Sequence, residues 1–163
     1  MTSSRVLIAI GAVLVLGAVN ASILGKESIK RDGAAIFLDL APIDPRSLVQ
    51  GDYMALRFRL AQEIESSMGG PNATRPREGE TRLAGITLDD RRVASLAKPE
   101  AAAPLKIRYR MRNNAVWLGT NAFFFEEGTE ARYSLARYGE FRLDAESGEA
   151  VLVGLRDAKL KPL

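Results

Sequence analysis

The sequence predicts one N-terminal transmembrane helix followed by a small, mainly antiparallel β domain of the α+β class with one or two short helices. An uncharged apolar run occupies residues 6–24. Apolar and polar residues alternate at 53–60 and at 106–112, which is typical of half-buried strands. Turn signals such as Asn113-Asn114 separate the alternating segments. A chain of 163 residues is long enough for one such domain and an anchor.

The composition narrows the chemistry that the chain can carry. It contains no cysteine and no histidine, which excludes disulfides, thiolate or imidazole metal sites, and nucleophiles activated by histidine. Its 23 basic and 20 acidic residues give a net charge of +3, which makes no general case for nucleic-acid binding. We therefore expect neither an enzyme nor a cofactor-binding protein.

The apolar run admits three interpretations. At about 1.5 Å per residue, a helix over residues 6–24 spans roughly 28 Å, close to the hydrocarbon thickness of a bilayer. It could be an uncleaved signal anchor, a signal peptide cleaved after Val19-Asn20-Ala21, or a buried core helix. We favour the anchor because the run is apolar on every face. The expected divisions are a membrane anchor at 1–25, a polar stalk at 26–33 and a β-rich domain at 34–163.

The charges around the run give opposing signals for orientation. Lys26, Lys30 and Arg31 follow it, and only Arg5 precedes it, so the positive-inside rule alone would place the domain in the cytoplasm. The very short N-terminal flank and the signal-like run favour export instead. We expect a single-pass protein of the cell (inner) membrane with an extracytoplasmic domain.

Period-two alternation and turn residues divide the domain into short elements. In its first half the expected elements are a strand at 34–40, a helical turn at 44–48, a strand at 53–60, a helix at 61–68, a loop at 69–80, and a hairpin formed by 83–89 and 92–96. In its second half they are strands at 106–112 and 115–119, an apolar segment at 122–126, a helix at 127–138, and a hairpin formed by 140–144 and 149–155. We expect Phe123 to Phe125 to belong to the core.

A short motif in the first half resembles the signature of the GDYXXLXY family of bacterial membrane-anchored proteins. The motif consists of Gly51, Asp52, Tyr53, Leu56 and Phe58, with Phe58 in place of the final tyrosine. The resemblance continues through an aromatic run and a closing hairpin, although Glu126 stands where the family usually has proline. It implies a membrane-tethered protein, and family members are often encoded beside, or fused to, multi-span membrane proteins.

We interpret the motif as structural. Gly51 supplies backbone freedom in a turn, Asp52 can accept hydrogen bonds from turn amides, and the Tyr53 ring can pack with its hydroxyl at the rim. The carboxylates of Asp39, Asp44 and Asp52 could together ligate a hard cation, but their spacing matches no metal-binding loop, and we expect no metal.

Basic residues occupy the polar positions of the two alternating segments. If the two strands are neighbours, they form a candidate basic binding face for an anionic headgroup, polymer or acidic partner. The alternative is a solvated sheet face whose cations pair with acidic residues across the strands. The residues of this face are Arg57, Arg59, Lys106, Arg108, Arg110 and Arg112.

These features lead to two functional hypotheses. The first is a non-enzymatic interaction or assembly partner of a multi-span membrane protein, tethered by the N-terminal helix. The alternative is a small domain that binds an anionic envelope component, either a lipid headgroup or a polymer, through the basic face.

Overall fold

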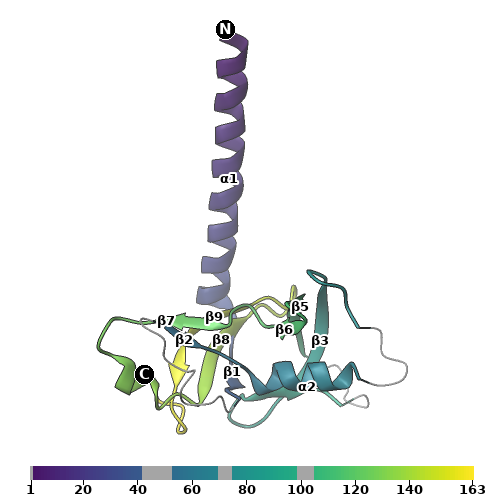
Figure 1. The fold of residues 1–163 in the computed structure, drawn as a ribbon, viewed down its shortest axis with the longest axis vertical. Helices are drawn as coiled ribbons and strands as arrows, with labels where there is room; N and C mark the ends of the chain where they lie inside the picture. Colours follow the sequence, from purple (N-terminus) through teal and green to yellow (C-terminus); the bar gives the residue numbers. More distant parts are fainter. Residues whose placement is uncertain (1, 42–52, 70–74, 99–104) are drawn as a thin grey trace.

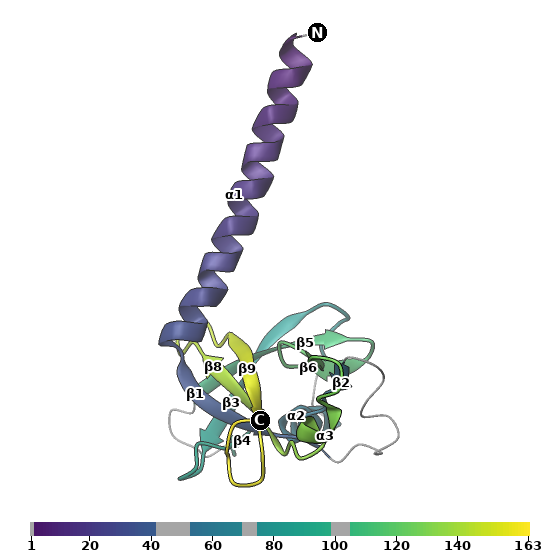
Figure 2. The same ribbon diagram turned by 90° about the vertical axis from the view of Figure 1, so that its left-hand side faces the viewer.

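The computed structural model describes residues 2–41, 53–69, 75–98 and 105–163, and shows one long helix standing on a small β-rich domain (Figure 1). Both views show the helix projecting away from the domain (Figures 1 and 2). This arrangement confirms the predicted fold class. The elements are α1 (Thr2–Asp32), β1 (Ala34–Asp39), β2 (Tyr53–Ala55), α2 (Arg59–Ser67), β3 (Thr81–Leu88), β4 (Ala94–Leu96), β5 (Leu105–Arg112), β6 (Ala115–Trp117), β7 (Ala122–Phe124), α3 (Glu130–Tyr133), β8 (Tyr138–Leu143) and β9 (Ala150–Arg156).

The described strands form three small sheets with antiparallel neighbours. One has the order β1-β8-β9, another β4-β3-β5-β6, and β2 pairs with β7 alone. The predicted hairpins β3-β4, β5-β6 and β8-β9 are confirmed. Asn113 and Asn114 both adopt positive φ, 51° and 61°, the conformation that a tight hairpin turn requires.

The predicted stalk is the docked end of α1. The helix continues without a break through Asp32, where a separate polar spacer was expected from residue 26. Residues 26–32 favour helix because they are rich in straight-chain residues, and Lys30 pairs with Glu27 at 3.0 Å one turn earlier. Ile29 is buried against the domain, and Lys26 forms an ion pair with Glu149 beside β9. The helix therefore meets the β8-β9 hairpin directly.

The N-terminal part of α1 is not part of the core. Its large apolar side chains from Val6 to Leu24 are exposed, with Leu7, Ile8 and Leu24 each about 70% accessible. The core-helix interpretation is therefore wrong. Within the part of the chain that the structure describes, α1 is the one helix long and apolar enough to cross a bilayer.

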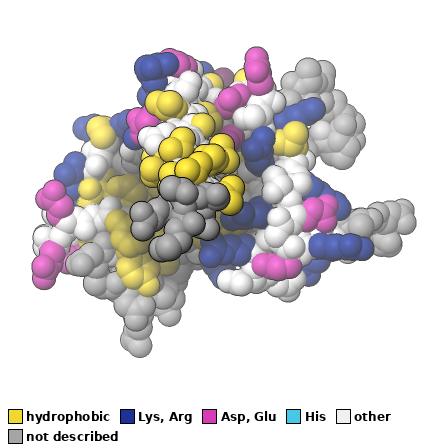
Figure 3. Space-filling view, turned by 90° about the horizontal axis from the view of Figure 1, so that it is seen from above, with side chains coloured by type: hydrophobic (Ala, Val, Ile, Leu, Met, Phe, Trp, Pro, Cys, Tyr) yellow, Lys and Arg dark blue, Asp and Glu magenta, His cyan; other side chains and the backbone are white. Residues whose placement is uncertain are grey.

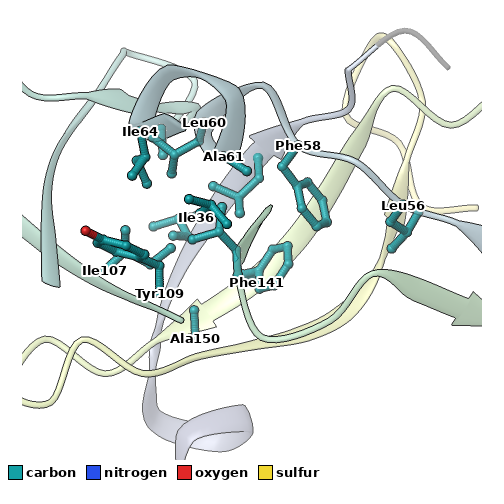
Figure 4. Close-up of a cluster of buried hydrophobic side chains, with 14 of the residues drawn as sticks. Ile36, Leu56, Phe58, Leu60, Ala61, Ile64, Ile107, Tyr109, Phe141 and Ala150 are labelled. Atoms are coloured by element: carbon teal, nitrogen blue, oxygen red, sulfur yellow. The ribbon is translucent and has the colours of Figure 1, made fainter. Parts of the chain in front are cut away.

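The hydrophobic core lies between α2 and the sheets, centred on Phe141 of β8 (Figure 4). Phe141 is fully buried and makes an edge-to-face contact with Phe58 at 5.3 Å between ring centroids. Leu60 and Ile64 project from α2 toward Ile36 of β1 and the rest of the cluster. This packing fixes the β1-β8-β9 sheet, on which α1 rests.

Two predicted elements have the wrong extent. The expected strand at 53–60 ends at Ala55, because Leu60, Ala61 and Ile64 follow a helical spacing and form the buried face of α2. The expected helix at 127–138 shrinks to the single turn of α3, which has no buried residue to support a longer helix. The helical turn expected at 44–48 lies outside the described residues.

Candidate functional site

The two runs of basic residues do not lie on adjacent strands. β2 pairs with β7, whereas β5 lies between β3 and β6. Arg57 and Arg59 also lie beyond the end of β2, and Arg59 opens α2. The condition for one continuous basic face, that the two strands are neighbours, is therefore not met. The reason is that strand pairing joins segments distant in the sequence, and alternation within a strand does not specify its partner.

Two of these cations pair with acidic residues, although neither pair joins neighbouring strands of one sheet. Arg59 pairs with Asp39 at 3.0 Å. Arg108 donates a hydrogen bond to the Ser147 carbonyl at 2.9 Å and lies 3.7 Å from the carboxylate of Glu149. The guanidinium of Arg112 lies 4.5 Å from the ring centroid of Trp117, the geometry of a cation–π contact.

One hollow brings together Arg57 and Arg112 from the two runs. It has a volume of about 270 Å³ and lies between α2, the segment after β2 and the β5-β6 hairpin. Its floor is apolar, formed by buried side chains that include Phe58 and Leu118, whereas its rim is polar. The rest of the lining includes Gln62, Glu65, Asn113, Trp117, Thr120 and Asn121.

A second hollow gathers Lys26, Arg108 and Arg110 beside the foot of α1. We call it the Lys26–Arg110 hollow; its volume is about 290 Å³. Glu149 is the one carboxylate in its described lining and pairs with both Lys26 and Arg108. Burial raises the pKa of Tyr109, which also borders it. The hollow therefore carries an excess of positive charge.

The hairpin that supplies Glu149 has a well-bonded turn. Asp144 accepts hydrogen bonds from the backbone amides of Glu146 and Ser147, at 2.8 and 3.1 Å. These amides, first that of Ser147, hold the pKa of Asp144 below its usual range. The backbone of Gly148 then contacts β5, because its carbonyl accepts a hydrogen bond from the Arg108 amide at 2.6 Å. The turn thus positions the Glu149 carboxylate between the side chains of Lys26 and Arg108.

An exposed aromatic pair lies on the neighbouring surface. Tyr53 of β2 and Phe124 of β7 are register partners, with ring centroids 5.8 Å apart. Phe124 is 75% accessible, so the expectation that it belongs to the core is wrong; Phe123 and Phe125 instead pack around Tyr133. The alternation of a strand turns Phe124 away from those two rings.

A third hollow extends from Phe124 to the foot of α1. It has a volume of about 470 Å³, and both Phe124 and Lys26 line it. Figure 3 views the domain from the α1 side and shows Lys and Arg side chains on the surface around the helix. Lys26, Gly119 and Ala150 border both this hollow and the Lys26–Arg110 hollow. Aromatic and basic side chains thus flank the same end of α1.

The short motif from Gly51 to Phe58 divides between surface and core. Gly51 and Asp52 lie outside the described residues, and Tyr53 is on the surface. Leu56 is buried, and its amide donates a hydrogen bond to the Asn121 carbonyl at 2.6 Å. Phe58 is also buried and packs on Phe141.

A sequence model of the GDYXXLXY protein family matches residues 15–155. The chain belongs to the GDYXXLXY family. The matched segment starts within α1 and ends in β9, so the family match covers the second half of the helix, its docking on the hairpin and most of the β domain. No curated protein matches this GDYXXLXY protein, and no solved structure matches it.

The sequence interpretation of this GDYXXLXY protein missed two members of the surface around α1. Lys26 was assigned to a stalk, although its place two residues after the apolar run and the helix-forming residues that follow it were signals for a continuous helix. Phe124 was assigned to the core with its neighbours, although alternation predicts that one of three consecutive strand residues faces the opposite side. Among the described residues, no three acidic side chains gather as a metal site.

Proposed function

We propose that this GDYXXLXY protein is a single-pass protein of the cell membrane whose extracytoplasmic domain assembles, without enzymatic activity, with a multi-span membrane protein. The observation that supports this proposal most is the docking of α1 on the domain. Ile29 is buried against the domain, and Lys26 pairs with Glu149 beside β9. Such a connection holds the domain in one orientation relative to the span, which a stable lateral contact requires.

The span itself offers the surface for that contact. A Cβ placed at Gly11 or Gly17 would meet nothing within 4 Å, so both positions are open to a neighbouring helix. Small residues allow transmembrane helices to approach closely. The signal-like apolar run supports export of the domain.

We expect the protein to remain in the membrane with its N-terminus intact. The apolar run is long enough to hold it there, and the helix continues beyond the candidate cleavage site at Val19-Asn20-Ala21 into the docked segment. Alkaline extraction of membranes followed by intact-mass measurement tests this expectation. A mature chain that begins at Ser22 would show that the run is a cleaved signal peptide.

We expect crosslinking in intact cells to join α1 to a multi-span membrane protein. A photoreactive residue at Gly11 or Gly17 would be placed on the open helix surface, and the product would be recovered in mild detergent and identified by mass spectrometry. The same residue at Lys159, in the loop after β9, provides the matched control. Recovery of a free monomer alone, at native expression, would contradict the assembly proposal.

A further inference from the structure

The span fixes the level of the bilayer relative to the domain. No charged residue occurs between Arg5 and Lys26, so the hydrocarbon layer ends near Lys26. Ile29, less than one helical turn further on, is already buried against the domain. The surface around Glu149, which pairs with Lys26, therefore lies at the level of the lipid headgroups.

Exposed aromatic side chains lie on this surface. Phe124 is 75% accessible and shares the third hollow with Lys26. Tyr53, itself exposed, packs beside it. An exposed phenylalanine gains by leaving water, and aromatic rings are enriched at the interface of membranes, where the surroundings are part apolar and part polar.

Basic side chains occupy the other flank of the same helix end. Lys26, Arg108 and Arg110 line the Lys26–Arg110 hollow together with the single described carboxylate of Glu149. Cations close to a bilayer are attracted to anionic headgroups. Figure 3, viewed from the side on which the bilayer would lie, shows Lys and Arg side chains, with Asp and Glu among them, on the surface around the helix.

We infer that the face of the domain around the foot of α1 rests on the headgroup layer of the bilayer that α1 crosses. Phe124, supported by Tyr53, inserts at the boundary between headgroups and acyl chains. The Lys26–Arg110 hollow binds the headgroup of an anionic phospholipid. The inference rests on the proposed membrane placement of α1 and is independent of the protein partner.

Depth-dependent quenching of tryptophan fluorescence tests the insertion of Phe124. The chain has a single tryptophan, Trp117, so Trp117→Phe gives a silent background into which Phe124→Trp is introduced. The full chain is reconstituted into phosphatidylcholine vesicles with bromine near the carbonyl end of the acyl chains. We expect roughly twofold or greater quenching, because interfacial residues reach this depth.

Leu135→Trp in the same background is the matched control. Leu135 is also an exposed apolar residue, 60% accessible, and follows α3, which lies at the end of the domain remote from α1 (Figure 2). We expect little quenching at this position. Equal quenching of the two tryptophans would overturn the inference. A chain that fails to float with the vesicles would overturn the membrane placement as well, whereas flotation without quenching at position 124 would overturn this inference alone.

Placing the bromine on either the anionic or the zwitterionic lipid tests whether the hollow binds an anionic headgroup. In vesicles that mix phosphatidylglycerol with phosphatidylcholine, we expect brominated phosphatidylglycerol to quench Phe124→Trp more than brominated phosphatidylcholine at the same mole fraction. Arg108→Gln combined with Arg110→Gln should bring the ratio of quenching by brominated phosphatidylglycerol to quenching by brominated phosphatidylcholine to about one, since the attraction is electrostatic. Lys159→Gln with Lys161→Gln removes the same charge after β9 and should leave the ratio unchanged. If both lipids quench equally in the chain that retains Arg108 and Arg110, the hollow does not bind an anionic headgroup and this part of the inference is overturned.

Discussion

Replacing Phe141 with alanine is expected to lower the free energy of unfolding of the β domain by about 3–5 kcal/mol, the cost of removing a fully buried aromatic ring. Phe141 is completely buried and packs edge to face on Phe58. Part of its surroundings is backbone: its ring carbons lie 3.0 Å from a Cβ placed on Gly139 and 4.0 Å from one placed on Gly119. Gly139 belongs to the paired strand β8, whose backbone cannot collapse into the space, so the cavity persists.

Urea unfolding of the full chain in detergent micelles, followed by Trp117 fluorescence, measures this loss. Phe124→Ala is the matched control, because it removes the same side chain from a site that is 75% accessible. We expect the control to change the free energy of unfolding by less than about 0.5 kcal/mol, as is typical of surface substitutions. A Phe141→Ala domain as stable as the control would contradict the assigned core.

Replacing Arg156 with methionine is expected to cost about 3 kcal/mol, because it leaves a buried carboxylate without its main partner. Glu140 is the one buried charged residue in the described core, 8% accessible, and its Oε2 accepts two hydrogen bonds from Arg156, that from Nε at 2.7 Å. Arg142 remains 3.7 Å from the other carboxylate oxygen, which places the cost at the lower end of the range for broken buried pairs.

A double-mutant cycle separates the buried charge from the loss of packing. Glu140→Met combined with Arg156→Met removes both charges, and we expect the double variant to recover to within about 1 kcal/mol of the original chain. Arg59→Met breaks the exposed pair with Asp39 and should cost no more than about 1 kcal/mol. If the losses of stability in Glu140→Met and Arg156→Met simply add in the double variant, the two side chains do not act as a pair.

The sequence by itself determined the features that depend on local chemistry. The apolar run predicted α1 because a bilayer demands a long uncharged helix. Asn113-Asn114 and Ser147-Gly148 predicted the two hairpins, since these residues tolerate the positive φ that the structure shows at Asn113, Asn114 and Gly148. Alternation also identified Ile107, Tyr109 and Met111 as the buried face of β5.

Only the tertiary structure decided which segments meet. β1 pairs with β8 about a hundred residues away, and β2 pairs with β7, so the two basic runs separate. Periodicity specifies which face of a strand is buried and leaves its neighbour open, because hydrogen bonds between backbones carry no sequence information. The same pairing places Phe124 beside Tyr53 and Glu149 beside Lys26. The surface at the foot of α1 is therefore a product of the fold, assembled from residues whose local sequence contexts indicated a stalk and a core.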